Sequence, residues 1–274
     1  MAKGSSTIVL SPKNPSLNPG WPVFSSFSQA TSIFRIRAKC GRMCGRFARY
    51  SLSRGLERHF SAHPAPFEVL PDYNVAPTQD IPVIVQQEDG RHIQKCHWGL
   101  VPFWAKDISI GSRMINARVE TVAMKPAFRA AFKQRRCLIP ADGFYEWHGT
   151  SGNKQPYYFH LPCSEPFAFA GLYENWVDKE ALAEAASYRS CTIITRDASD
   201  SVNAVHNRMP MILEPAAYAE WLDPEIEAPS KIEAILKSGS VKNLKHHPVS
   251  KWVNRIGNNA KECMEPLKDI RDQG

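Results

Sequence analysis

The chain has 274 residues, of which 43% are hydrophobic and 22% are charged. This length allows a substantial buried core in one large domain or two small ones. The apolar runs are short, and none approaches the ~20 residues of a membrane-spanning helix. We therefore expect a protein with no membrane partner.

The formal net charge of +7 is unevenly distributed. Residues 1–42 contain six Lys or Arg and no acid, whereas the rest of the chain carries 28 basic and 27 acidic residues. Residues 95–140 hold nine Lys or Arg against two acids, Asp107 and Glu120. Such a stretch is typical of a polyanion-binding surface, or of an ordinary solvated face.

Residues 1–42 also include eight Ser and four Pro. This composition is typical of an organelle transit peptide, of a disordered extension, or of sequence upstream of a start at Met43. We expect a leader over 1–42, one domain over 43–268 and a tail over 269–274. The protein is then nuclear or cytosolic if synthesis starts at Met43, and plastid or mitochondrial if the leader is a transit peptide.

The expected elements follow one another with few helical crossovers. Strands rich in β-branched and aromatic residues are predicted at 81–86, 92–98, 136–140, 143–147, 156–161, 167–172 and 190–195. Helices are predicted at 53–62, capped by Ser53, and at 126–135, 215–221 and 230–238, with a last element over 249–256. This order favours an antiparallel α+β domain over a parallel sheet.

The seven cysteines show no C-x-x-C spacing. This pattern indicates reduced thiols, with neither a disulfide framework nor a metal site, and we expect no cofactor. One of them, Cys44, directly follows Met43. If Met43 is an initiator and is removed, Cys44 carries a thiol and an α-amine on adjacent carbons, which can close an aldehyde into a thiazolidine. The alternative is a buried thiol inside the chain.

Three further segments carry candidate functional residues. Asn116 and Arg118 are two residues apart, so an extended strand would present them on one face, suited to a sugar hydroxyl and a phosphate. Alternatively, Asn116 caps a turn. Glu146 lies among aromatic residues, where burial would raise its pKa toward that of a general acid or base, and Trp147 could stack on an unpaired base. Otherwise Glu146 is an exposed strand residue.

The third segment contains His206, which can transfer protons near neutral pH, and Arg208, a second candidate phosphate ligand. A lone histidine can equally serve a structural hydrogen bond. A cysteine, a glutamate and a histidine in one chain also match the side chains of a thiol hydrolase.

Taken in order, these segments resemble the SRAP family, the SOS-response-associated peptidases or abasic-site processing proteins. The matching motifs are MCGRF at 43–47, YNVAPT at 73–78, WGLVP at 98–102, NAR at 116–118, ADGFYEW at 141–147, FAGLY at 169–173, HNRMP at 206–210, residues 249–254 and ECMEP at 262–266. The resemblance spans nearly all of residues 43–266. It implies a compact, mainly antiparallel, barrel-like fold with short peripheral helices.

The resemblance also implies that the protein recognises abasic sites in single-stranded DNA, shields the lesion during the DNA damage response and forms a thiazolidine crosslink through Cys44. Asn116 would contact the abasic sugar, Glu146 would orient or deprotonate the amine, and His206 would assist ring opening and crosslink reversal. The implied DNA contacts are Arg46, Trp98, Arg118, Trp147 and Arg208. Replication-fork proteins are implied partners, and a monomer is the default state.

The family's chemistry needs a free α-amine, whereas 43 residues precede Cys44 here. Initiation at Met43, cleavage before Cys44, or autocatalytic removal of the leader would each expose it. Two other functions fit the same residues. One is a general cysteine peptidase that uses Cys44, His206 and Glu146, and the other is a non-catalytic reader of damaged or modified DNA.

Overall fold

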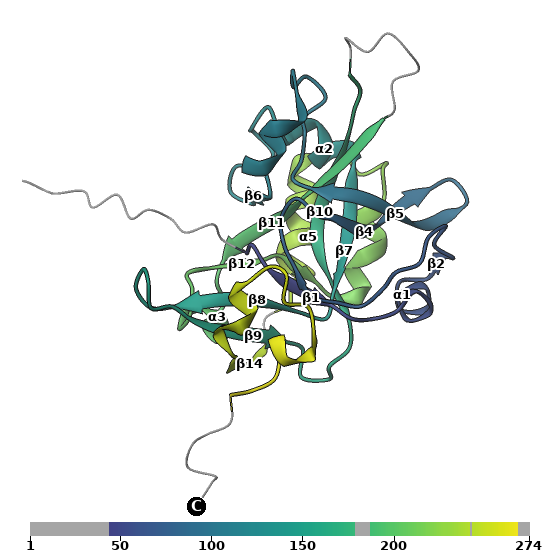
Figure 1. The fold of residues 1–274 in the computed structure, drawn as a ribbon. Helices are drawn as coiled ribbons and strands as arrows, with labels where there is room; N and C mark the ends of the chain where they lie inside the picture. The colour runs from purple at the N-terminus through teal and green to yellow at the C-terminus, as the bar shows by residue number, and fades with distance from the viewer. Residues whose placement is uncertain (1–43, 179–186, 242, 268–274) are drawn as a thin grey trace, which may run out of the picture. The chain divides into compact units, whose positions relative to one another are not determined.

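A computed structural model describes residues 44–178, 187–241 and 243–267. Strands are the main regular elements of this part, and the helices are short (Figure 1). The strands are β1 (Phe47–Arg49), β2 (Ala62–His63), β3 (Asp72–Val75), β4 (Asp80–Gln87), β5 (Gly90–Trp98), β6 (Asn116–Arg118), β7 (Arg136–Ala141), β8 (Gly143–His148), β9 (Gln155–His160), β10 (Phe167–Trp176), β11 (Tyr188–Asp197), β12 (Arg208–Pro210), β13 (Ile212–Leu213) and β14 (Lys245–Pro248).

The α-helices are α1 (Ser53–Phe60), α2 (Arg129–Gln134), α3 (Asp200–Asn203), α4 (Tyr218–Leu222) and α5 (Pro229–Ser238). Four short 3₁₀ helices are η1 (Ile108–Arg113), η2 (Pro215–Ala217), η3 (Lys251–Asn254) and η4 (Lys261–Cys263). Among the described residues, no helix is long and apolar enough to span a membrane.

The larger sheet closes on itself. Its strand order is β12-β11-β10-β7-β4-β5-β2, and β5 also pairs with β11, which joins β11, β10, β7, β4 and β5 into a ring. The β5–β11, β6–β11 and β2–β5 pairings are parallel, and the other pairings are antiparallel. The closing contact is short, with His97 and Trp98 of β5 opposite Ser190 and Cys191 of β11, so parts of these two edges remain for β2, β6 and β12 to pair with. The predicted mainly antiparallel, barrel-like α+β class is confirmed.

The smaller sheet has the order β14-β9-β8-β1-β3 and is antiparallel throughout. It connects to the ring through the turn between β7 and β8, which contains the buried Asp142. The carboxylate of Asp142 accepts hydrogen bonds from the Tyr50 and Ser51 N–H groups and from the Ser51 hydroxyl. This side chain therefore fixes β8 against the segment that follows β1.

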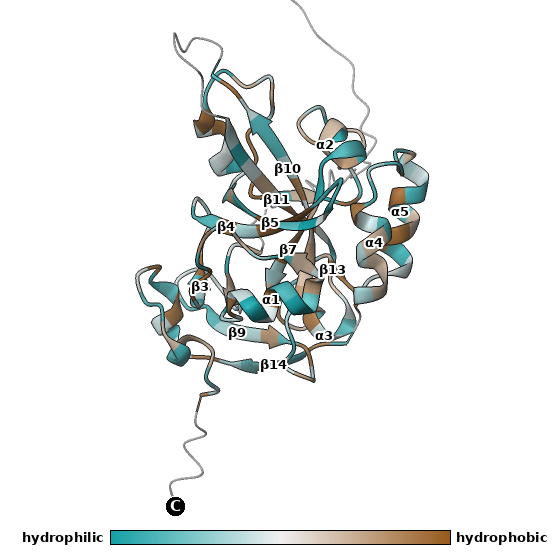
Figure 2. Cartoon of the chain, turned by 90° about the vertical axis from the view of Figure 1, so that its right-hand side faces the viewer, coloured by the Kyte–Doolittle hydropathy of each residue, from teal (hydrophilic) through white to brown (hydrophobic). Residues whose placement is uncertain are grey.

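Side chains that alternate between the two faces of a strand contribute to two separate hydrophobic cores. On β7, Cys137 and Ile139 belong to one core together with Phe47 of β1, whereas Leu138 belongs to a second core together with Trp221 of α4. Successive side chains of a strand point to opposite faces, so one strand serves both cores. Helices α4 and α5 lie side by side in this second core (Figure 2).

All seven predicted strands are present, and β10 and β11 run beyond their predicted ends. Of the predicted helices, 126–135 shortens to α2, and 215–221 divides into η2 and α4. The predicted cap at Ser53 is wrong, because Leu52 occupies the cap position and the Ser53 hydroxyl accepts from Val69 N–H at 3.1 Å. The leader over 1–42 and the tail over 269–274 lie outside the described residues.

Candidate functional site

Cys44 and Glu146 meet beside the smaller sheet. Phe47 of β1 pairs with Phe144 of β8 in antiparallel register, so the chain before β1 runs alongside the end of β8. The Cys44 N–H donates to Glu146 Oε1 at 2.8 Å, and the two residues are 4% and 3% exposed. Cys44 has a φ of 43°, a left-handed conformation uncommon for a residue other than glycine. The chain thus turns at the residue whose N–H faces the carboxylate.

Burial governs the protonation of this pair. It raises the pKa of Glu146, against the opposing effects of the His206 charge and the hydrogen bonds from Cys44. It also raises the pKa of the Cys44 thiol well above its ordinary value, and the nearby Glu146 carboxylate adds to this effect. A charged group loses hydration when buried, so its neutral form is favoured. The Cys44 thiol is therefore protonated at neutral pH.

Asn116 approaches the same residue from β6. This strand pairs in parallel with β11, where Asn116 lies opposite Ile193. The Asn116 side-chain amide donates a long hydrogen bond, 3.5 Å, to the Cys44 carbonyl oxygen. Arg118, two residues along the strand, is exposed, and Ala117 between them is buried. The structure therefore brings Asn116 to Cys44 and leaves Arg118 at the surface.

His206 lies just after α3 and is half-buried. Its N–H donates to the Val202 carbonyl at 3.0 Å, and its Nδ1 accepts from the Arg208 N–H at 3.1 Å. Nδ1 also lies 3.2 Å from the Arg208 carbonyl oxygen, so this side of the ring faces the Arg208 backbone. The charge of His206 lowers the pKa of Glu146, which places the imidazole within electrostatic reach of the Cys44–Glu146 pair.

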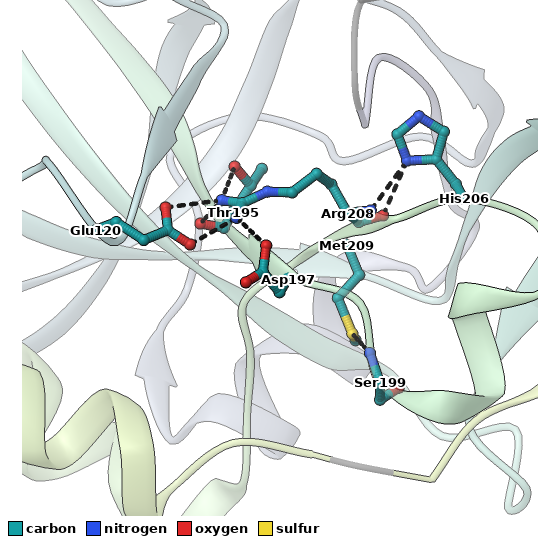
Figure 3. A network of polar contacts seen from close by, with 7 residues as sticks. All are labelled: Glu120, Thr195, Asp197, Ser199, His206, Arg208 and Met209. Atoms are coloured by element: carbon teal, nitrogen blue, oxygen red, sulfur yellow. Dashed lines mark hydrogen bonds and ion pairs between the residues drawn. The ribbon is translucent and has the colours of Figure 1, made fainter.

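Arg208 reaches away from His206 to two carboxylates (Figure 3). Its guanidinium bonds to both oxygens of Glu120 at 2.5 and 3.0 Å, to Asp197 at 2.6 Å and to the Thr195 carbonyl at 2.9 Å. Arg208 is 7% exposed. Burial alone would lower its pKa, but the hydrogen bonds to Glu120 and Asp197 raise it. Arg208 is thus a buried cation whose charge also lowers the pKa of the Cys44 thiol.

Arg46 is half-buried between the smaller sheet and the C-terminal segment. Its Nη1 donates to Asn74 Oδ1 at 2.7 Å and to the Val253 carbonyl at 2.8 Å. The Asn74 amide nitrogen in turn donates to the carbonyls of Val253, Arg255 and Asn258. Arg46 and Asn74 together hold residues 253–258 against β1 and β3.

The two tryptophans predicted to contact DNA occupy different environments. Trp98 has no exposed surface, packs edge-on against Phe47 and donates from Nε1 to the Ile115 carbonyl at 2.9 Å. Trp147 is half-buried and donates from Nε1 to Asn254 Oδ1 at 2.8 Å. Trp98 is therefore a core residue in this structure, whereas Trp147 keeps part of its ring at the surface.

Two groups of residues lie outside the predicted set of site residues. The carboxylates of Glu120 and Asp197 were not assigned to Arg208, although Glu120 lies two residues after the NAR motif. The aromatic side chains of Phe103 and Trp104, within the basic stretch, are 51% and 45% exposed. Large apolar groups at such exposure are a common mark of a binding surface. The WGLVP motif that ends at Pro102 was a signal for their position.

The six described cysteines are free. Five of them are buried and Cys163 is exposed. Cys44 differs from the other buried thiols in having a carboxylate hydrogen-bonded to its own backbone nitrogen. It is therefore this local arrangement that sets Cys44 apart, since burial alone does not.

Comparison with known proteins gives consistent matches. The family model described as SOS response associated peptidase (SRAP) matches residues 43–256. The "Abasic site processing protein YoaM" of Bacillus subtilis is 39% identical over 226 residues, which cover 81% of this chain and 98% of that protein. The "Abasic site processing protein HMCES" of Gallus gallus is 32% identical over 229 residues, 72% of this chain and 67% of that protein.

Among solved structures, a crystal structure of a protein from Bacteroides thetaiotaomicron matches with a TM-score of 0.72 at 22% identity. The match covers 82% of this chain and 100% of that one. At this identity the likeness supports the fold alone.

Proposed function

This chain belongs to the SOS response associated peptidase (SRAP) family, and on that premise we propose that it binds abasic sites in single-stranded DNA covalently through Cys44. The observation that carries the proposal is the hydrogen bond of 2.8 Å between the Cys44 nitrogen and Glu146 Oε1. In a chain that begins at Cys44, this nitrogen is the α-amine. Its proton then faces a buried carboxylate that can accept it.

The chemistry balances without an oxidant or a cofactor. The α-amine attacks the aldehyde carbon of the ring-opened abasic sugar, and loss of water gives an imine. The Cys44 sulfur then adds to the imine carbon while the thiol proton passes to nitrogen, which closes a five-membered thiazolidine. One aldehyde and one aminothiol thus give a thiazolidine and one water.

Each nearby side chain has a role in this sequence. Glu146 takes the ammonium proton, because its raised pKa brings it nearer to that of the donor. His206, whose Nδ1 faces the Arg208 backbone, exchanges a proton with the sugar oxygen through Nε2 during ring opening and during reversal. Asn116 holds the Cys44 carbonyl and contacts the sugar.

Exposed basic and aromatic side chains of the domain suit a single strand. Arg118 is exposed on β6 and is placed to bind a phosphate. Phe103 and Trp104 expose aromatic rings on which unpaired bases can stack. An abasic site in a single strand needs no base to be flipped out of a duplex, which removes an unpairing cost of a few kcal/mol.

The environment of the thiol disfavours a general cysteine peptidase. Such an enzyme needs a thiolate, usually stabilised by a neighbouring cation. Here burial and Glu146 raise the pKa of Cys44, and only Arg208 opposes them among the causes that shift it. A protonated thiol can still add to an imine after the amine has reacted. We include autocatalytic removal of the residues before Cys44 in the proposal, as one route to the free amine.

The test uses four forms of the chain and an oligonucleotide with one abasic site. The form that begins at Cys44 should give a heat-stable shifted band on a denaturing gel, and a matched Cys163→Ser variant should do the same. The form that retains Met43 should give no band. Cys44→Ser keeps the amine, so its band should appear only when borohydride reduces the imine.

Two outcomes would contradict the proposal. A heat-stable band from Cys44→Ser without reductant, or an equal band from the form with Met43, would show that the aminothiol is not the reacting group. Tight binding with no covalent band from any form would favour the non-catalytic reader. An oligonucleotide with all its bases intact serves as the control for DNA without an aldehyde.

A further inference from the structure

A cluster of two histidines and one aspartate lies at the outer end of β5. The parallel pairing of β2 with β5 places His63 directly opposite His92. Asp89 lies in the turn between β4 and β5, one residue before β5 begins. The ring nitrogens of the two histidines and a carboxylate oxygen of Asp89 all lie within 4.8 Å of one another. Nearly thirty residues separate His63 from the other two, so only the sheet brings them together.

The backbone fixes this arrangement before any ligand binds. The Arg91 guanidinium donates to the Phe60 carbonyl at 2.9 Å, which ties the segment leading into β2 to β5. Gly90 has a φ of +134°, and a β-carbon at this position would lie 2.9 Å from His63 Nε2. A residue with a side chain would therefore be strained at position 90 and would crowd the imidazole. The glycine leaves the space through which His63 reaches the turn.

Both imidazoles already contact Asp89. His63 Nε2 donates to the Asp89 carbonyl oxygen at 2.9 Å, and His92 Nε2 lies 2.7 Å from Asp89 Oδ1. The imidazole rings stack with their centroids 4.6 Å apart. Both Nε2 atoms therefore face the same residue, His63 at the Asp89 backbone carbonyl and His92 at the Asp89 carboxylate.

We propose that His63, Asp89 and His92 form a binding site for a divalent transition metal of the Zn²⁺ class. Two imidazole nitrogens and one carboxylate are a common zinc ligand set, with bonds of about 2.0–2.2 Å. Tetrahedral bonds of that length place ligand atoms ~3.4 Å apart, a spacing that side-chain rotation would give to three ligand atoms that all lie within 4.8 Å of one another. Exposure of Asp89 and His63 leaves the fourth position open to water.

This site is separate from Cys44. In Figure 1, β2 and the neighbouring end of β5 lie on the opposite side of the sheets from β6 and β12, which carry Asn116 and Arg208. A metal at this position would clamp the two-residue β2 to the β4–β5 turn. The cysteine spacing gave no hint of it, because the ligands are histidines and an aspartate from two strands.

The experiment measures Zn²⁺ binding to the full chain by calorimetry, with no polyhistidine tag. Cys44→Ser and Cys163→Ser are present in every sample, which removes the exposed thiol of the described residues and any aminothiol chelate. The parent chain should bind one Zn²⁺, and His63→Gln and His92→Gln should each weaken binding by at least about tenfold. Co²⁺ in place of Zn²⁺ should give a visible spectrum that these two variants lose.

His246→Gln is the matched control, because His246 is an exposed histidine on β14 that lies outside the cluster. It should bind Zn²⁺ as the parent does. If a histidine variant proves unfolded by circular dichroism, Asp89→Asn gives the same comparison with an exposed side chain. The proposal is overturned if the parent binds no Zn²⁺, if the cluster variants bind as tightly as the parent, or if His246→Gln loses binding equally.

Discussion

Replacing Glu146 with glutamine separates its chemical role from a structural one. Glutamine keeps the size of the side chain and an oxygen that can accept from the Cys44 nitrogen, but it cannot take up a proton. A positioned general base contributes about 10²–10⁴ in rate. We therefore expect Glu146→Gln, in a chain beginning at Cys44, to form the crosslink about 100-fold more slowly at neutral pH. This corresponds to about 2.7 kcal/mol of activation free energy.

The free energy of unfolding of Glu146→Gln should stay equal or rise, although its crosslinking rate falls. Burial raises the folded-state pKa of Glu146 above its unfolded value. Glu146 therefore makes its full contribution to the stability of the folded state below the unfolded pKa of about 4.3. This contribution declines as the pH rises through the folded pKa. At neutral pH the buried carboxylate costs stability, and a neutral glutamine avoids this cost. Glu146→Gln should have a free energy of unfolding at pH 7 equal to or above that of the parent.

The assay is the single-turnover rate of heat-stable adduct formation between pH 4 and 8, with urea unfolding on the same samples. The parent rate should rise with pH through the Glu146 titration, and the variant should lack this rise. A variant rate within twofold of the parent would refute the role of Glu146 as the base. A slow rate accompanied by a loss of stability would indicate a structural role instead.

Three further predictions concern the fold and the thiols. Gly143→Ala should lower the free energy of unfolding by about 1–3 kcal/mol in urea titrations, because its β-carbon would lie 2.2 Å from a buried tyrosine ring. Glu120→Gln should cost about 1 kcal/mol at pH 7, as the half-exposed partner of Arg208. Because Arg208 lowers the pKa of Glu120 against the effect of burial, this difference should vanish as the pH falls below about 4. In the folded full chain, iodoacetamide should modify Cys163 well before Cys44, as read by peptide mass spectrometry, and equal rates would contradict the burial of Cys44.

The long strands and the position of Glu146 could be predicted from sequence, because both rest on local pattern. Strands of six or more residues show alternation or β-branched runs, and a glutamate flanked by aromatic residues in such a strand is a candidate for burial. The short strands β1, β2, β6 and β12 have only two or three residues each and show no such period. They form because longer neighbours offer unpaired edges.

Pairing between strands that are distant in the sequence could not be predicted from the local sequence pattern. Ring closure depends on β5 meeting β11, whose paired residues Trp98 and Cys191 are far apart in the chain. That closure buries Trp98, whose motif suggested a surface role. The same kind of pairing joins Arg208 to Glu120, and His63 to His92. Charge partners and ligand sets of this kind become visible only when the register of the sheets is known.

The register also explains why burial of Glu146 suits the chemistry of an N-terminal cysteine. An α-amine titrates near ~8 and an ordinary glutamate near ~4.3, so moving a proton from one to the other spans about 3.7 pKa units, or ~5 kcal/mol. Each unit by which burial raises the pKa of Glu146 removes about 1.4 kcal/mol from this cost. An exposed carboxylate at the same 2.8 Å would bind the amine but hold its proton poorly. The β1–β8 pairing that buries both groups therefore supplies the geometry and the proton acceptor together.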